Sequence, residues 1–115
     1  MNRALASSAV FVIALGGATL RAQEPTKQTL DIYKLKCQLC HKADGTGVTP
    51  EMSFSDGKWI HGSSLAEIRK VITEGVKGKA MMSYAKQFSP EEIEGLARYV
   101  RSFDKSLKPD PGPAK

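Results

Sequence analysis

Two cysteines separated by two residues and followed at once by a histidine constrain this chain more than any other feature: Cys37, Cys40 and His41. On a helical turn, residues three apart face the same way. Both thiols can therefore add to the two vinyl groups of one haem, while the adjacent imidazole reaches the iron beneath the ring. Cys-x-x-Cys-His is the pattern of covalent attachment of haem c.

Two other kinds of site use a Cys-x-x-Cys pair, a zinc site and a dithiol redox centre. A zinc site needs about four ligands, but the chain holds only these two cysteines and one further histidine, His61. A thioredoxin-like pair is expected beside a βαβ unit, which this sequence does not indicate. A disulfide between residues so close in sequence would add little stability. Haem attachment is therefore the interpretation that the pattern favours.

Residues 1–22 differ in composition from the rest of the chain. Asn2 and Arg3 lead into an apolar run, and small residues ending at Ala22 precede a polar stretch. This is typical of a cleaved secretory signal peptide. The run contains Ser, Gly and Thr and is too short to favour a permanent span, which needs about 20 mostly apolar residues. We expect a periplasmic protein; the alternative is a protein anchored in the membrane by an uncleaved N-terminal segment.

The net charge of the chain limits the classes of macromolecule that it is expected to bind. Removal of residues 1–22 takes away Arg3 and Arg21 and lowers the net charge from +5 to +3. A nucleic-acid binder would be expected to carry a much denser basic stripe, so nucleic acid is excluded as a partner. We expect the exported protein to be a monomer with no stable membrane span.

The remaining sequence predicts three helices and no strand, which is an all-α fold. The first spans about residues 26–36 and could continue through the cysteine pair. Its apolar face is expected to hold Leu30, Tyr33 and Cys37. A Gly- and Ser-rich segment, about residues 42–63, follows as a long irregular connection. A connection of this length is unusual in a compact domain unless it wraps a ligand.

The second and third helices carry clear start signals. Ser64 and Ser89 are each followed three residues later by glutamate, which forms a capping box, and Pro90 occupies a favoured first helical position. Gly75 ends the second helix. Gly95 lies inside the third helix at a cost of about 1 kcal/mol relative to Ala, so we expect close backbone approach there. The expected apolar faces are Leu65, Ile68 and Ile72 on the second helix, and Ile93, Leu96, Ala97, Val100 and Phe103 on the third.

The sixth coordination position of the iron has several candidate ligands. Met81 and Met82 follow a Gly-rich loop between the second and third helices, where the backbone could approach a haem closely. A thioether ligand favours ferrous iron and raises the reduction potential. His61 would instead give a bis-histidine haem of lower potential. Met52 is a further candidate, but it would have to cross to the opposite face of the ring.

Taken together, these residues resemble the class I c-type cytochromes, which are small single-haem proteins. The resemblance extends from about residue 26 to residue 103. It consists of an aromatic residue four positions before the first cysteine (Tyr33), the Cys-x-x-Cys-His motif, residues 56–62, the methionine loop and the last helix. It implies an all-α cytochrome c domain, residues 23–104, with three main helices and long loops around one covalently bound haem c. Residues 105–115 would form a flexible, Pro-rich tail.

The resemblance also implies individual roles. In the family, the axial methionine is usually followed by proline, with an aromatic residue two positions further on. Met81 is therefore the implied ligand, Met82 stands in the proline position, and Tyr84 is the aromatic residue. The carbonyl of Pro50 is expected to accept the His41 ring N–H. Trp59 is expected either to bind a haem propionate or to pack in the core. Thr29 stands where the family often has glycine, at the crossing of the first and last helices.

An iron bound by both histidine and methionine has no free position for a substrate. The sequence therefore predicts an electron carrier rather than an enzyme. This carrier would pass electrons from a donor to a terminal reductase or oxidase. The alternatives are a cytochrome subunit of a dehydrogenase or oxidase complex, and a haem enzyme or gas sensor with an open sixth position. Residues 32–43 and 76–90 carry six lysines and no acidic residue, which predicts redox partners with acidic docking patches.

Overall fold

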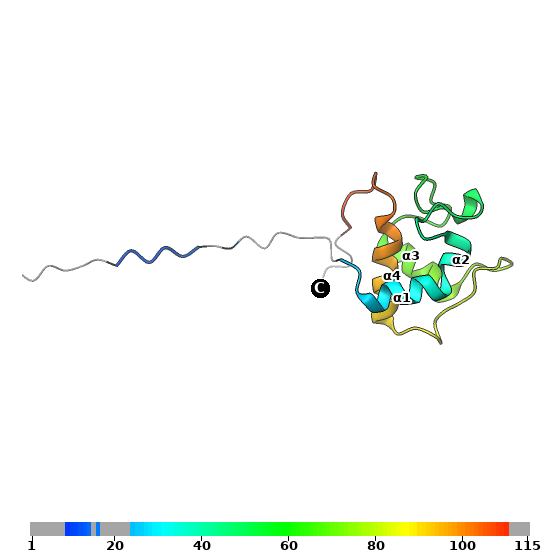
Figure 1. Ribbon diagram of the computed structural model, residues 1–115, viewed down its shortest axis with the longest axis horizontal. Coiled ribbons are helices and arrows are strands. Elements are labelled where there is room, and N and C mark those ends of the chain that lie inside the picture. The colour runs from blue at the N-terminus through cyan, green and yellow to red at the C-terminus, as the bar shows by residue number, and fades with distance from the viewer. Residues whose placement is uncertain (1–8, 15, 17–23, 111–115) are drawn as a thin grey trace, which may run out of the picture.

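The computed structural model describes residues 9–14, 16 and 24–110. These residues form helices and loops without a strand: α1 (Lys27–Lys36), α2 (Gln38–His41), the 3-10 turn η1 (Pro50–Met52), α3 (Leu65–Glu74) and α4 (Pro90–Ser102). Figure 1 shows α1, α3 and α4 gathered into one body, with residues 9–14 lying away from it. The predicted all-α fold is confirmed.

The predicted signal peptide and the end of the predicted tail are largely outside the described residues. Among residues 9–14, 16 and 24–110, no helix has the length and apolar character that crossing a membrane requires.

The starts of α3 and α4 follow the sequence signals. The Ser64 hydroxyl accepts the backbone N–H of Glu67, whose carboxylate accepts the N–H of Ser64 in return. Ser89 and Glu92 form the same reciprocal pair, with Pro90 in the first helical position. Both capping boxes satisfy backbone donors that the first turn of a helix leaves without partners.

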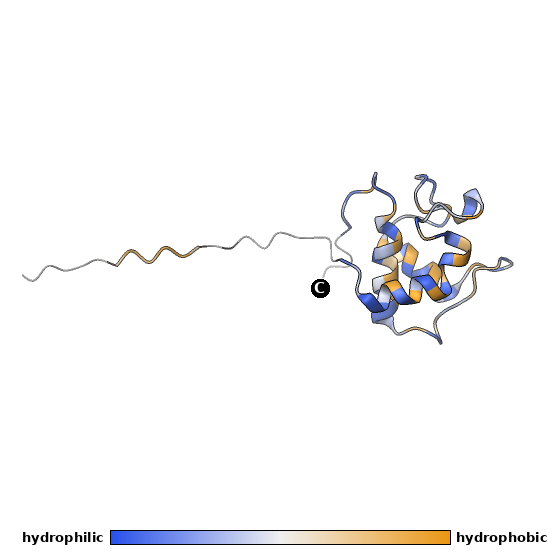
Figure 2. Cartoon of the chain, viewed as in Figure 1, coloured by the Kyte–Doolittle hydropathy of each residue, from blue (hydrophilic) through white to orange (hydrophobic). Residues whose placement is uncertain are grey.

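The core lies where α1, α3 and α4 meet, and Figure 2 shows apolar residues concentrated there. All the apolar positions predicted for α3 and α4 belong to it except Phe103, which is half-buried against it. On α1 the expected face is partly wrong, because Leu30 is 40% exposed while Thr29 and Tyr33 are buried. The helix is rotated so that Thr29 faces α4. The buried apolar residues are Tyr33, Leu65, Ile68, Ile72, Tyr84, Ile93, Leu96, Ala97 and Val100.

The crossing of α1 and α4 is close because Gly95 lies on α4 at the point of contact. A Cβ added there would stand 2.7 Å from Thr29 Oγ1, which is well inside van der Waals contact. The small residue that this crossing requires is therefore on α4 instead of α1. One turn further along α1, the Tyr33 ring meets that of Tyr99 edge-on, with the centroids 5.0 Å apart.

The segment after α4 is held against the domain as far as Asp110. The buried Asp104 carboxylate accepts the N–H and hydroxyl of Ser106. Arg101 donates to the carbonyls of Ser63 and Lys108, and Asp110 accepts the backbone N–H of Leu65 at 2.8 Å. This differs from the expectation that residues 105–115 form a flexible tail. The reason is that Arg101 and Asp110, at the two ends of the segment, bind the backbone just before α3 and at its first residue.

We expect the effect of Gly95→Ala on stability to change sign with the residue at position 29. In the wild-type background the new Cβ would overlap Thr29 Oγ1, and overpacking of this kind costs about 1–3 kcal/mol. In a Thr29→Ala background that oxygen is gone, so the same change should stabilise the protein by up to about 1 kcal/mol through helix propensity. Denaturant unfolding of the four proteins measures both effects. Equal effects of Gly95→Ala in the two backgrounds would contradict the close crossing.

Candidate functional site

The cysteine–histidine motif occupies one tight turn at the end of α1. Cys37 ends α1 and precedes the single turn α2, where the N–H of His41 donates to the carbonyl of Cys37 at 3.0 Å. Cys37 and Cys40 are both free thiols and half-buried. Burial raises the pKa of Cys37 to about 11, so this thiol is protonated at neutral pH. The turn presents two thiols and one imidazole from five consecutive residues.

The His41 imidazole is fixed by a carbonyl group. Its Nδ1 lies 2.7 Å from the carbonyl oxygen of Met52. A carbonyl only accepts, so Nδ1 carries the proton and the lone pair of the neutral ring is on Nε2. Burial lowers the pKa of His41, while the bond to Met52 acts in the opposite direction. A neutral imidazole with a free Nε2 lone pair is the form that binds a metal.

The prediction that the carbonyl of Pro50 accepts this bond is wrong. That carbonyl accepts the N–H of Ser53 at 3.2 Å and thereby closes η1. The turn leaves the carbonyl of Met52, two residues further on, directed to His41. Sequence position located the correct segment, but the direction of each carbonyl depends on the 3-10 turn, which the sequence pattern did not indicate.

The residue after the motif has an unusual backbone. Lys42 has φ 62° and ψ 161°, a region that is occupied almost only by glycine. The buried Tyr33 holds it there, since its hydroxyl donates to the carbonyl of Lys42 at 2.6 Å. Burial raises the pKa of the Tyr33 hydroxyl, so it remains a donor. Tyr33 thus links the α1–α4 core to the end of the Cys37–His41 turn.

The two adjacent methionines have different environments. Met81 is half-buried and packs against the core, and its carbonyl accepts the N–H of Val76 at 2.9 Å. Met82 is 55% exposed, and its sulfur lies 3.7 Å from Nε2 of Gln87. The short bond from Val76 closes the loop 76–81, so this loop leaves α3 and returns beside it.

Tyr84 joins the methionine loop to the cysteine turn. Its buried hydroxyl donates to the carbonyl of Lys36 at 3.3 Å. Its pKa is raised by burial and by the neighbouring thiols of Cys37 and Cys40. The structure therefore brings the segment after Met81 next to the cysteine pair, as the predicted site requires.

Two stacked aromatic rings pack against the His41 imidazole. The ring of Phe54 stacks on the imidazole with the centroids 4.3 Å apart, and the ring of Trp59 stacks on Phe54 at 5.9 Å. The Trp59 indole N–H donates to Asp104 at 2.8 Å. Trp59 is partly buried and packs against the core.

Phe54 and Asp104 were missed as members of this assembly. Phe54 was the only aromatic residue between Lys42 and Gly57, and an aromatic residue within a polar loop was a signal that something there is buried. Asp104 precedes Ser106 by two residues, the spacing at which an aspartate caps its own turn. Their pairing with His41 and Trp59 is a tertiary feature with no signal in the local sequence.

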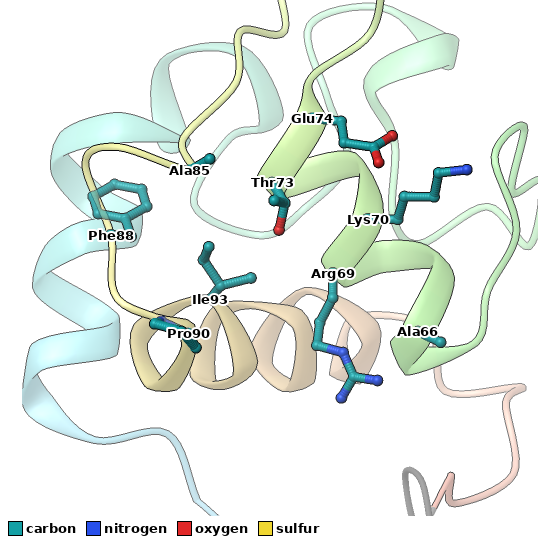
Figure 3. A pocket seen from close by; sticks show the side chains of 9 residues that line it. All are labelled: Ala66, Arg69, Lys70, Thr73, Glu74, Ala85, Phe88, Pro90 and Ile93. Atoms are coloured by element: carbon teal, nitrogen blue, oxygen red, sulfur yellow. The ribbon is translucent and has the colours of Figure 1, made fainter.

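A separate hollow of about 450 Å³ lies between α3 and the start of α4 (Figure 3). Apolar Phe88 and Ile93 form part of it, and Arg69 at its edge is bonded to Glu94 at 2.5 Å. None of the cysteines, His41 or Met81 contributes to it. It is therefore distinct from the candidate site.

Comparisons with known proteins identify the fold. The solved structure of a c-type cytochrome, KustC0563, is 30% identical in sequence with a TM-score of 0.57, and the match covers 67% of this chain and 98% of that one. Cytochrome c6 from the diatom Phaeodactylum tricornutum is 26% identical with a TM-score of 0.57, covering 69% and 93% of the two chains. These likenesses show a c-type cytochrome fold.

Sequence relatives include an oxidase subunit and a further cytochrome c6. The cbb3-type cytochrome c oxidase subunit CcoP of Rubrivivax gelatinosus is 31% identical over 72 residues, which is 63% of this chain and 24% of that protein. Cytochrome c6 of Rippkaea orientalis is 30% identical over 70 residues, 60% of this chain and 62% of that protein. The chain thus spans about a quarter of the length of the oxidase subunit that it matches.

The family is defined by a match over residues 24–100 to cytochrome c oxidase, cbb3-type, subunit III. The chain belongs to this family of c-type cytochromes, as the predicted resemblance to class I c-type cytochromes indicated, and membership implies haem c. The donor set of the structure fits that group. Two free thiols share a turn with a neutral, carbonyl-anchored imidazole, and a half-buried thioether lies on a loop that Tyr84 joins to the same turn.

We expect Lys42→Gly to stabilise the protein. A backbone of this kind costs about 1–3 kcal/mol in a residue with a side chain, and glycine removes that cost while losing about 0.5–1 kcal/mol through the entropy of the unfolded chain. The net gain should be about 1 kcal/mol in denaturant unfolding. Lys42→Ala is the matched control, since it removes the charge and keeps the Cβ. If the alanine variant gains as much as the glycine variant, backbone strain is not the cause.

Proposed function

We propose that this protein is an electron carrier with a single haem c, attached through Cys37 and Cys40 and bound at the iron by His41 and Met81. The anchored His41 imidazole beside two free thiols is the observation that carries the proposal. When bound, haem c supplies a one-electron redox couple at its iron. The chain holds the group covalently and fixes the orientation of its histidine ligand through Met52.

Met81 is favoured over the other candidates for the sixth position by its environment. It is half-buried against the core, whereas Met82 is more than half exposed and its sulfur contacts Gln87. His61 is exposed in the loop before α3. The backbone of Met52 lies on the His41 side, where its carbonyl binds the imidazole.

Two ligands from the chain leave no coordination position for a substrate, which supports a carrier without turnover of its own. The predicted signal peptide, residues 1–22, places the carrier in the periplasm under this proposal. A haem enzyme or gas sensor would need an open position, which Met81 would fill under this proposal.

Partner docking is proposed for the surface formed by residues 32–43 and 76–90, here called the lysine collar. Its lysines are all exposed: Lys34, Lys36, Lys42, Lys77, Lys79 and Lys86. Three large apolar side chains in the same segments are exposed as well: Leu35 at 79%, Leu39 at 89% and Met82 at 55%. Positive charge around exposed apolar groups suits a redox partner that presents an acidic patch.

A second candidate function is that of the cytochrome domain of an oxidase complex, which the family match favours. Both functions use the same iron ligands and differ in the partner. Copurification of the native protein with a larger membrane complex would support the second, whereas recovery as a free monomer from the periplasm supports the carrier.

Optical spectra test the ligand assignment. The wild-type ferric protein should be low-spin and show the weak far-red band of iron–sulfur ligation, and the reduced protein should fail to bind carbon monoxide promptly. Met81→Ala should lose the far-red band and bind carbon monoxide when reduced. Met82→Ala, the matched control, should retain the wild-type spectrum. Loss of the band in Met82→Ala alone would transfer the ligand role to Met82, and a high-spin wild-type protein would refute the carrier.

Ionic strength tests the lysine collar. The second-order rate constant for electron transfer with an acidic redox protein should fall as salt rises, because salt screens the attraction between exposed charges. Lys86→Gln should reduce the rate constant at low salt more than Lys105→Gln, which removes the same charge from the segment beyond α4. A rate constant independent of ionic strength, or equal effects of the two variants, would remove the collar as the docking surface.

A further inference from the structure

Two glycines occupy similar places in the loops next to the proposed ligands His41 and Met81. Gly47 (φ +76°) lies in the loop after His41, and Gly75 (φ +72°) ends α3 before the methionine loop. Each packs against a peptide group later in its own loop. The segment after each peptide is also tied back, by the bond from the N–H of Phe54 to Gly45 and by the bond from the N–H of Tyr84 to Ile72.

The contact at Gly47 is with the group that anchors His41. A Cβ at position 47 would lie 2.6 Å from the carbonyl carbon of Met52, 2.7 Å from the nitrogen of Ser53 and 2.8 Å from the oxygen of Met52. That oxygen is the acceptor for Nδ1 of His41. The atoms that this Cβ would overlap are backbone atoms in a loop closed by η1. They cannot move aside as the end of a flexible side chain can.

The contact at Gly75 has nearly the same geometry. A Cβ at position 75 would lie 2.6 Å from the carbonyl carbon of Met82, 2.7 Å from the nitrogen of Ser83 and 2.8 Å from the oxygen of Met81. That last oxygen accepts the N–H of Val76, the bond that closes the methionine loop. The backbone of Met81 is thus positioned against a residue with no side chain.

We propose that Gly47 and Gly75 are positioning residues that set the two axial ligands, Gly47 by placing the acceptor for His41 and Gly75 by placing the backbone of Met81. This inference rests on the proposed function, since it takes His41 and Met81 as the ligands. The hydrogen bond to a ligating histidine makes the imidazole a stronger donor, which stabilises ferric iron. Displacement of the Met52 carbonyl by a Cβ at position 47 therefore raises the reduction potential.

The chain offers matched controls. Gly57 (φ +75°) and Gly78 (φ +76°) have nearly the same positive φ as Gly47 and Gly75, and a Cβ at either position would meet nothing within 4 Å. Alanine at each of the four positions must adopt a positive φ, so a difference between the pairs reports chiefly on the contact. Asparagine variants at the four positions provide a second series, because asparagine tolerates this backbone better and still carries a Cβ.

The experiment measures the reduction potential, the far-red band and the hydrogen exchange of the His41 Nδ1 proton in the haem-loaded variants. Gly47→Ala or Gly47→Asn should raise the potential and accelerate this exchange while keeping the far-red band. Gly75→Ala or Gly75→Asn should shift or lose the band. The Gly57 and Gly78 variants should match the wild type in all three readouts.

Three outcomes would overturn the inference. One is that the Gly47 and Gly75 variants fold and match their controls, and another is that the potential falls in the Gly47 variants. The third is that neither substitution at position 47 or 75 yields a folded haem protein while the controls fold, which would make both glycines structural only. A wild-type protein without the far-red band refutes the proposed function itself, so the two failures are distinguishable.

Discussion

The contact between α1 and α4 determines where the chemical groups of this protein point. Gly95 lets Thr29 approach, and the buried Tyr33 ring then packs against Tyr99 while its hydroxyl binds the carbonyl of Lys42. That last bond fixes the end of the turn that holds both thiols and the imidazole. A looser crossing would move Tyr33, and the Cys37–His41 turn would lose its support on the core side. The packing of two helices thus determines the orientation of the proposed ligand His41.

Around this crossing, backbone carbonyls act as the positioning groups of the site. The carbonyl of Met52 orients His41, that of Lys42 receives Tyr33, and that of Lys36 receives Tyr84. Carbonyls in closed turns are more rigid than side chains, which suits the proposed role of His41 as a ligand that keeps one geometry in two oxidation states. The polar connection between α2 and α3 is therefore part of the site, although only η1 within it is helical.

Much of the fold and of the candidate site could be predicted from the sequence because the signals for them are local. The capping boxes at Ser64 and Ser89 gave two helix starts, and the spacing of Cys37, Cys40 and His41 placed their side chains on one turn. The rotation of α1 was missed, since Leu30 has the apolar spacing but the choice of face depends on Gly95, far away in the chain. The acceptor for His41 lies two residues beyond the predicted one, because the direction of a carbonyl depends on loop geometry. The partner of Trp59 lies beyond α4, so no local pattern indicates it.

The column of rings from His41 through Phe54 to Trp59 also has a spectroscopic consequence. Trp59 is the single tryptophan of the chain, and it lies one ring away from the proposed histidine ligand. A porphyrin absorbs where tryptophan emits, so in the haem-loaded protein excitation energy should pass from the indole to the haem and leave the folded state dark. Emission would return when this loop separates from the ring. The molecule therefore carries an intrinsic fluorescent reporter for the opening of this loop.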